Sequence, residues 1–193
     1  MDNRITVGSL SQIMQDSHKT LAQAFLGIKY LVLADVSGSM DTDDFRQHKT
    51  RWERMKEALA RVQAEHPGEV FVVSFSDDAE PNANGIPSET HGGTDLEAGL
   101  QYAIGKNVDK LGIKIIIISD GQPDDENGCL NTAAQISAPI DCIFIGPEDP
   151  RDPGRLFLRK LANRTKGTFQ DTPGAKMLTE SVERLMLSDG KNR

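Results

Sequence analysis

The sequence is poor in cysteine, and this scarcity excludes one class of protein. Its 193 residues contain two cysteines, Cys129 and Cys142, too few for the disulfide framework of a small secreted domain. Cys142 lies in the apolar run 140–145, where a cysteine is expected as a small buried hydrophobic side chain. Cys129 falls in a predicted helix without a base beside it. Unpaired thiols of this kind indicate a reducing, cytoplasmic location.

Long apolar runs are also missing, and no secretory signal is evident. No stretch approaches the roughly 18 apolar residues of a membrane-spanning helix, so no membrane association is expected. Residues 1–4 are followed by mixed polar sequence, which does not resemble a secretory signal.

The sequence has no excess of positive charge. It carries 22 Lys and Arg against 29 Asp and Glu, a net charge of −7, which argues against nucleic acid as a main partner. Acidic residues gather in loops that follow predicted strands: Asp41, Asp43, Asp44, Asp77, Asp78, Asp124, Asp125, Glu148 and Asp149. Such a field would concentrate divalent cations and attract a basic partner surface. Loop carboxylates are also simply solvated and favour helix N-termini, and the two interpretations are compatible.

Common catalytic motifs are absent as well. The sequence has no G-x-x-x-x-G-K-[ST] loop and no G-x-G-x-x-G turn, so nucleotide chemistry has no visible phosphate cradle. Its four histidines show no triad or zinc spacing: His18, His48, His66 and His91. We therefore do not expect an enzyme.

What the sequence does contain is a regular alternation of strands and helices. Its length and its 37% hydrophobic content suit one domain with a real core. Periodicity predicts strands at 30–34, 70–75, 113–119, 140–145 and 167–170. It predicts helices at 9–25, from Asp43 or Asp44 to Glu65, from Thr94 onward, and at 125–137, 155–164 and 177–185. Short connections between these elements predict a doubly wound α/β fold with a mostly parallel central sheet flanked by helices.

The chain is expected to divide into three parts. Residues 1–27 form an N-terminal extension, with residues 1–8 loose and an amphipathic helix that packs on the sheet; a docking or dimerisation helix is the alternative. Residues 28–187 form the main domain, and residues 188–193 a tail. Segment 76–89 has room for an irregular edge strand. In helix 155–164 the leucines are expected to face inward: Leu156, Leu158 and Leu161. The basic residues of segment 151–166 are expected to form a solvated face, with a partner-docking ridge as the alternative: Arg151, Arg155, Arg159, Lys160 and Arg164.

Oxygen-bearing side chains follow two apolar predicted strands. Asp35, Ser37 and Ser39 come at alternate positions directly after strand 30–34, and Asp120 follows strand 113–119. Between them, the glycine-rich segment 91–97 opens a helix at Thr94. Ligands of open α/β sheets bind beyond the carboxyl ends of strands, and Mg²⁺ commonly takes oxygen ligands that include one or two carboxylates. The alternatives are an ordinary turn at 35–39 and a helix capping box formed by Thr94 with the glutamate three residues on.

The motifs Asp-x-Ser-x-Ser, Gly-Gly-Thr and Ser-Asp-Gly-x-Pro occur in that order and together resemble the von Willebrand factor type A domain over about residues 28–170. The resemblance implies a Rossmann-like sheet and a metal-ion-dependent adhesion site made of Asp35, Ser37, Ser39, Thr94 and Asp120. It implies Mg²⁺, with Mn²⁺ and Ca²⁺ as alternatives, and a protein partner that offers a Glu or Asp to the metal. Small cytoplasmic prokaryotic and phage members of the family act beside MoxR-type AAA+ ATPases, or in tellurite-resistance and phage-related gene clusters. The resemblance therefore suggests an adaptor of this kind.

Two other functions compete with this interpretation. The first is a Mg²⁺-dependent hydrolase or phosphatase with Asp35 as nucleophile, as in haloacid-dehalogenase-type enzymes. Those enzymes carry a second Asp where this sequence has Ser37, and Lys114 precedes its strand rather than following it. The second is a purely structural role, in which the bound metal only stabilises the fold. Structural metal sites are usually closed, so the expected exposure of this site disfavours that role.

Overall fold

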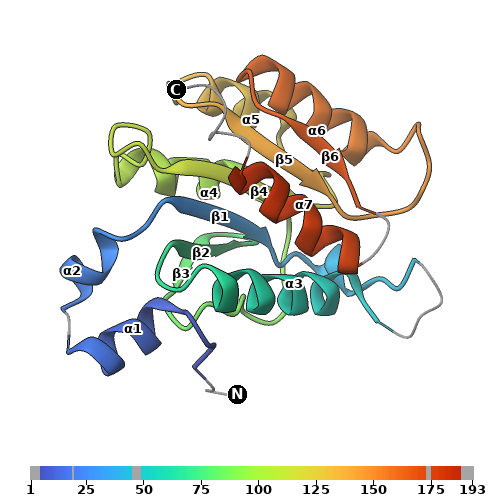
Figure 1. The fold of residues 1–193 in the computed structure, drawn as a ribbon. Coiled ribbons are helices and arrows are strands. Elements are labelled where there is room, and N and C mark those ends of the chain that lie inside the picture. Colours follow the sequence, from blue (N-terminus) through green and yellow to red (C-terminus); the bar gives the residue numbers. More distant parts are fainter. Residues whose placement is uncertain (1–4, 19, 45–48, 173–174, 188–193) are drawn as a thin grey trace.

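A six-stranded sheet forms the centre of the computed structural model, which describes residues 5–18, 20–44, 49–172 and 175–187 (Figure 1). The strands are β1 Tyr30–Asp35, β2 Val70–Phe75, β3 Ala79–Asn82, β4 Lys114–Ser119, β5 Ile140–Phe144 and β6 Phe169–Asp171. Their order across the sheet is β3-β2-β1-β4-β5-β6. Only β3 runs antiparallel to its neighbour among these paired strands.

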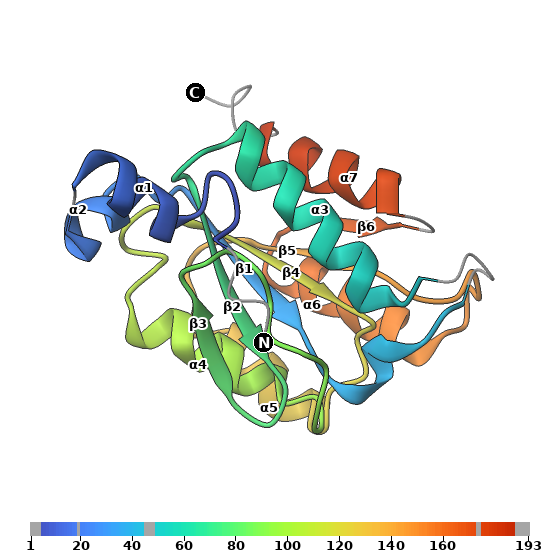
Figure 2. The same cartoon turned by 90° about the horizontal axis from the view of Figure 1, so that it is seen from below.

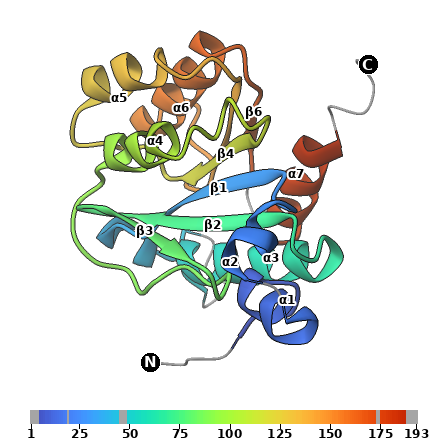
Figure 3. The ribbon, with the colours of Figure 1, turned by 90° about the vertical axis from the view of Figure 1, so that its left-hand side faces the viewer.

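Helices cover both faces of the sheet. They are α1 Leu10–Ser17, α2 Leu21–Phe25, the 3-10 turn η1 Gly38–Asp41, α3 Arg51–Glu65, α4 Leu96–Gly105, α5 Glu126–Ala133, α6 Pro153–Arg164 and α7 Ala175–Leu187. Figures 2 and 3 show α3 and α7 on one face and α4, α5 and α6 on the other. This arrangement confirms the predicted doubly wound α/β fold.

The central strands are buried on both sides, which explains their unbroken apolar sequences. Side chains alternate between the faces of a strand. In β4, Ile115 and Ile117 therefore join the core under α4–α6, whereas Ile116 and Ile118 join the core under α3 and α7. The predicted strands at 30–34, 70–75, 113–119 and 140–145 are confirmed within one residue at each end. The edge strand expected within 76–89 is β3, and the last strand starts two residues later than predicted.

The N-terminal segment differs from its prediction. A single helix was expected over 9–25, but His18 takes a left-handed conformation with φ of 52°, and the segment forms α1 and α2. Thr20 then starts α2 with its own capping box. Both helices contribute to the core, as expected, because Leu10 and Ala24 are buried there.

Residues 5–8 are held in place rather than loose. The Thr6 amide donates to the Asn84 carbonyl (3.2 Å), and the Gly68 amide donates to the Gly8 carbonyl (2.8 Å). Gly68 directly precedes β2, so these contacts place the N-terminal segment at the amino ends of the parallel strands. In Figure 1 α1 and α2 lie to the left of the sheet, where β1 begins. The predictions for residues 1–4, as part of a loose terminus, and for residues 188–193, as a tail, fall outside the described residues.

Three helix predictions are corrected. Helix α3 begins at Arg51, capped by Thr50 in a box with Glu53, and not at Asp43 or Asp44. Helix α6 turns Phe157 inward with Leu158 and Leu161, whereas Leu156 is 48% exposed. Met177 in α7 is exposed to the same extent. The other apolar residues assigned to these faces are buried as expected: Leu158 and Leu161 in α6, and Leu178, Val182 and Leu185 in α7.

Both cysteines are buried and free, which confirms the burial predicted for Cys142 and the lack of a disulfide between the two. Within the described part of the chain, no helix has the length and apolar character required to span a bilayer.

Candidate metal site

The candidate site lies at the centre of the carboxyl edge of the sheet. From β1 the chain crosses to β2 on one side, and from β4 it continues to β5 on the other, so the strand order reverses between β1 and β4. Asp35 is the last residue of β1, and Asp120 directly follows β4. Ligands of open α/β sheets bind at such a reversal, and the topology therefore brings the two predicted carboxylates together.

Asp35 is fully buried and held by both of its oxygens. Oδ1 accepts from the Ser37 amide (2.8 Å), and Oδ2 accepts from the Ser119 hydroxyl (2.5 Å). Ser119 in turn accepts from the Gly121 amide (2.7 Å). Burial, and next the charge of Asp120, raise the pKa of Asp35 to about 7, although the hydrogen bonds from Ser119 and Ser37 act in the opposite direction. Ionised Asp35 is thus unfavourable unless a further positive charge compensates it.

The two predicted serines converge on one point. Their hydroxyl oxygens lie 3.0 Å apart, and η1 carries Ser39 at an exposed position while Ser37 is buried. In an octahedral Mg²⁺ site with oxygens at about 2.1 Å, neighbouring ligands are about 3.0 Å apart. The serine pair therefore has the spacing of two adjacent ligands of one small cation.

Thr94 does not form the capping box that its sequence allows. Helix α4 begins one residue later than that box requires, and its N-cap is Asp95, whose Oδ1 accepts from the Ala98 amide (3.0 Å). The Thr94 amide donates to Asp124 (3.0 Å), and among the described residues its hydroxyl makes no hydrogen bond. The hydroxyl is consequently not committed to the helix.

Backbone contacts bring the Thr94 loop against the β1 loop. The His91 amide donates to the Val36 carbonyl (2.8 Å), and the Gly38 amide donates to the Gly92 carbonyl (3.2 Å). Among the described residues, no side-chain hydrogen bond joins Thr94 to the other four predicted ligands. Its placement in the site thus rests on the loop, whereas hydrogen bonds link Asp35, Ser37 and Ser39 directly or through neighbours.

Asp120 is paired with an arginine that the sequence analysis did not include. Its Oδ2 accepts from Nη1 of Arg51 (2.6 Å), which also approaches the Ser39 carbonyl (3.4 Å). Its Oδ1 is buried and has no hydrogen-bond partner among the described residues. Buried oxygens are normally satisfied, so this atom marks a place where a cation would complete the site.

Sequence reasoning missed two residues of the site for different reasons. Ser119 was visible, because it lies within the Ser-Asp-Gly motif that identified Asp120, but its hydrogen bond to Asp35 depends on the sheet register. Arg51 carried no signal, since the predicted helix began earlier and gave it no special position. Only the corrected start of α3 places it beside Asp120.

The ligand set suits a hard cation. Two carboxylates and three hydroxyls provide oxygen alone, which favours Mg²⁺, Mn²⁺ or Ca²⁺ over zinc. Within the described segments, no group of three or more His, Cys, Asp or Glu is arranged to hold a metal. The candidate site therefore depends on its hydroxyls to supplement two carboxylates.

An acidic cavity of about 270 Å³ adjoins the Thr94 loop. It is lined by Asp77, Asp95, Glu97, Asp124, Asp125 and Cys129. Burial, with the neighbouring carboxylates, raises the pKa of Cys129 to about 12, so its thiol is not nucleophilic at neutral pH. Several of these carboxylates accept backbone hydrogen bonds, as Asp77 does from the Gly93 amide (2.6 Å). The acidic rim predicted from the loops is thus partly structural.

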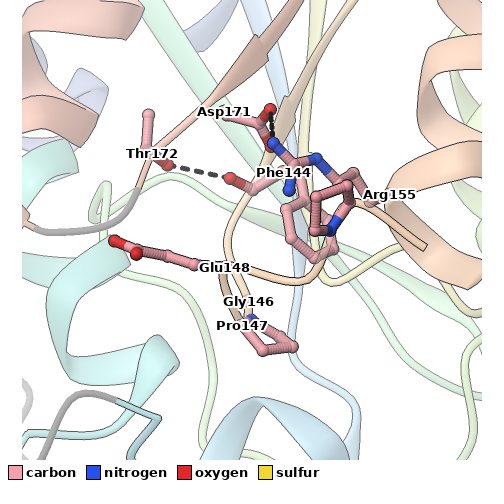
Figure 4. Close-up of a pocket in the computed structure, with 8 residues that line it drawn as sticks. Phe144, Gly146, Pro147, Glu148, Arg155, Asp171 and Thr172 are labelled. Carbon is pink, nitrogen blue, oxygen red and sulfur yellow. Dashed lines mark hydrogen bonds and ion pairs between the residues drawn. The ribbon is translucent and has the colours of Figure 1, made fainter. Parts of the chain in front are cut away.

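A second cavity of similar volume lies farther along the same edge, between β5, β6 and the start of α6 (Figure 4). Its lining includes Phe144, Pro147 and Arg155, and Arg155 forms an ion pair with Asp171. Arg159 also approaches Asp171 and stacks on Phe169. Two of the bases predicted to form an exposed ridge are therefore engaged with β6.

Comparisons with known proteins support the fold. No protein-family model matches the chain. Calcium-activated chloride channel regulator 1 of Macaca mulatta is 27% identical over 114 residues, 58% of this chain but 12% of that protein. The Bos taurus protein of the same name is 27% identical over 182 residues, 82% of this chain and 19% of that protein. This chain therefore spans less than one fifth of the curated relatives it matches.

Solved structures share the architecture at low identity. An aerotolerance-related membrane protein from Bacteroides fragilis NCTC 9343 superposes with a TM-score of 0.61 at 12% identity, covering 82% of this chain and 98% of that one. BatB from Bacteroides thetaiotaomicron gives 0.58 at 15% identity, covering 83% of this chain and all of that one. Together with the strand order and helix placement, these similarities show a doubly wound α/β fold, which is the fold that the resemblance to the von Willebrand factor type A domain implied.

Proposed function

We propose that this domain is a metal-dependent protein-binding module. In this proposal Mg²⁺ is held by Asp35, Ser37, Ser39, Thr94 and Asp120, directly or through water, and a Glu or Asp of a partner protein completes its coordination. Mn²⁺ and Ca²⁺ are the alternative ions. The proposal is supported most strongly by one observation: two serine hydroxyls 3.0 Å apart stand beside two buried carboxylates.

Each residue has a distinct part in this proposal. Asp35 forms the floor, because it is fully buried and fixed by the Ser37 amide and the Ser119 hydroxyl. Ser39 lies at the open side, where it is exposed to solvent. Thr94 approaches on its own loop, and the lack of a capping bond leaves its hydroxyl able to turn toward the ion. The exposure of Ser39 favours an open ligand position over a closed structural site.

The bound ion would supply a positive centre that attracts a carboxylate. Two ionised aspartates balance its charge, while the hydroxyls add none. A neutral metal site holds an incoming anion less tightly than a cationic one, so binding is expected to be reversible and strongly dependent on the ion. The acidic cavity beside it would favour a partner whose carboxylate is flanked by basic residues.

We do not propose catalysis. Asp35, the nucleophile of the hydrolase alternative, is followed two residues later by Ser37 instead of a second aspartate. A nucleophilic mechanism of this kind requires a general acid or base within reach. His91, on the loop that contacts the β1 loop, has its ring against the Glu89 carbonyl and the Ser76 hydroxyl.

The proposal extends to the setting of the protein. A cytoplasmic domain with this site would serve as an adaptor that recruits a partner, such as a MoxR-type AAA+ ATPase or a stress- or phage-related complex. Nucleic acid and membranes are not proposed as partners, given the net charge of −7. This part of the proposal is supported by sequence resemblance alone.

The test combines metal binding with partner capture. Wild type, Asp35→Ala and Asp78→Ala are titrated with Mg²⁺ by calorimetry and used as bait in lysate of the source cell, in Mg²⁺ and in EDTA. Asp78 is an exposed carboxylate on the same edge and serves as the matched control. We expect a protein retained by wild type and Asp78→Ala in Mg²⁺ only. Retention by Asp35→Ala with unchanged sensitivity to EDTA would reject the proposed site.

A further inference from the structure

Arg51 places a fixed positive charge beside the candidate metal site. Its Nη1 lies 2.6 Å from Oδ2 of Asp120, and the side chains of Arg51 and Asp120 are 10% and 2% exposed. This is a well-buried ion pair formed with a proposed metal ligand. The guanidinium thus occupies the immediate surroundings of the position that a divalent cation would take.

Asp44 holds Arg51 from the opposite side. Nε and Nη2 of Arg51 donate to the two oxygens of Asp44 at 2.5 and 2.8 Å, the fork geometry in which arginine binds a carboxylate most strongly. Burial disfavours the charged guanidinium, but Asp44 and Asp120 outweigh it and raise the pKa of Arg51. The arginine is therefore charged at every pH of interest and fixed between two carboxylates.

The position of Arg51 in its helix argues that this arrangement is specific to the site. It is the first residue of α3, where the positive end of the helix dipole disfavours a cation. The side chain is held there against that dipole by two carboxylates, one of which is Asp120. A role confined to stabilising α3 would be better served by an acidic residue at this position.

We propose that Arg51 sets the affinity of the metal site, acting as the counter-ion of Asp120 when no metal is bound and lowering the affinity for divalent cations. The proposal rests on the metal site of the proposed function. Two effects oppose each other when Arg51 is removed: Asp120 becomes less restrained, which weakens binding, and a nearby positive charge disappears, which strengthens it. The second effect prevails, because repulsion between a fixed charge and a divalent ion a few ångströms away in a buried setting exceeds the cost of restraining one short side chain.

Asp44 then acts in the opposite direction. It offsets the charge of Arg51, so its removal leaves the guanidinium uncompensated and free to bind Asp120 more strongly. The pair Asp44–Arg51 would tune how readily Asp120 exchanges the arginine for a metal ion. Arg51→Gln and Asp44→Asn are therefore expected to shift the metal affinity in opposite directions.

Mn²⁺ binding measured by electron paramagnetic resonance tests this without any partner protein. We expect the Kd for Mn²⁺ to fall about tenfold in Arg51→Gln and to rise about tenfold in Asp44→Asn. Arg51→Lys keeps the charge and should stay closer to wild type than to Arg51→Gln. Arg155→Gln removes a comparable paired arginine elsewhere on the same edge and serves as the matched control, with no change in Kd.

A double-mutant comparison separates this role from a purely structural one. In an Asp120→Asn background, the substitution Arg51→Gln should tighten Mn²⁺ binding less than it does in wild type, because Arg51 no longer competes with the ion for the Asp120 carboxylate and only its repulsion of the ion is relieved. Weaker or unchanged binding in folded Arg51→Gln would overturn the proposal, as would an absence of Mn²⁺ binding in all variants. Should Arg51→Gln fail to fold, the proposal is overturned if Asp44→Asn binds Mn²⁺ as tightly as wild type. The expected Mn²⁺ results without metal-dependent partner capture would reject only the proposed function.

Discussion

Asp35 makes the stability of the metal-free protein depend on pH in an unusual direction. Its pKa is raised from 3.8 to about 7 by burial and by Asp120, so between about pH 4 and pH 7 the folded protein holds a proton that the unfolded chain has released. Stability falls with rising pH wherever the native state binds more protons. This contribution is therefore fully present below pH 4 and is lost as the pH rises through 7.

The corresponding prediction concerns both stability and metal binding. In EDTA, urea unfolding should show a loss from this residue of up to about 1.4 kcal/mol per pH unit between pH 5 and pH 7. Asp35→Asn, which keeps the shape and removes the charge, should flatten that slope. Mg²⁺ affinity should increase with pH up to about 7 and then level off, because the ion requires the ionised carboxylate. Calorimetry that finds equal affinities at pH 6 and pH 8 would contradict this.

Among the secondary-structure elements, the contact between the end of β4 and the start of α6 is the tightest near the site. A Cβ added to Gly154 would lie 1.9 Å from the Asp120 carbonyl oxygen, and one added to Gly121 would lie 2.4 Å from the Gly154 carbonyl oxygen. Gly121 also has a positive φ of 74°. Helix α6 therefore approaches the Asp120 backbone as closely as two glycines permit.

Gly154→Ala should accordingly move α6 away from Asp120. We expect a destabilisation of about 1–3 kcal/mol from overpacking, together with weaker Mg²⁺ binding because Asp120 shifts. Gly105→Ala is the control, since a Cβ there meets nothing within 4 Å, and in a helix alanine is favoured over glycine by roughly 0.5–1 kcal/mol. Urea unfolding and calorimetry check both variants. Equal stability of the two would show that the junction yields without cost.

The elements differ in how far they could be predicted from the sequence. The buried strands were predictable because β-branched runs such as Ile115–Ile118 suit only a doubly covered position. Helix starts were not, because acidic residues near α3 and threonine before α4 imitate caps that Thr50 and Asp95 form instead. The prediction of the buried face of a helix was wrong where two apolar residues are adjacent in sequence, as with Leu156, which is exposed, and Phe157, which is buried.

The sequence could predict only those parts of the candidate site that belong to short sequence motifs. Asp35, Ser37 and Ser39 follow one strand, and local geometry determines their arrangement. The ion pair between Arg51 and Asp120 joins residues 69 positions apart and depends on where α3 begins. Contacts of this kind arise from tertiary packing, for which a single sequence offers no periodic signal.

At the scale of the whole molecule, the N-terminal helices and the candidate site lie at opposite ends of the parallel strands. Leu10 and Ala24 belong to the core, and Phe25 meets Phe71 edge to face with ring centroids 5.2 Å apart. The extension thus behaves as part of the folded unit at the amino ends of the strands, while the site lies at their carboxyl ends.

This separation predicts that stability and metal binding can be changed independently. Leu10→Ala, at 1% exposure, should lower the free energy of unfolding by about 2–5 kcal/mol through the cavity it creates. Leu26→Ala, at 87% exposure, should change it by less than about 0.5 kcal/mol. Neither should alter the Kd for Mg²⁺ of the folded protein. A Leu10→Ala variant as stable as wild type would show that the extension only rests on the domain.

The two outer strands determine how this molecule can meet its neighbours. β3 has four residues and includes Pro81, which lacks an amide hydrogen, and β6 has three residues. Short edge strands, and edge strands that contain proline, are poor templates for the addition of another strand. A second copy or an extended peptide would find few backbone groups to pair with there. Self-assembly into continuous sheets is thereby discouraged, and contacts with other proteins are directed to side chains and loops.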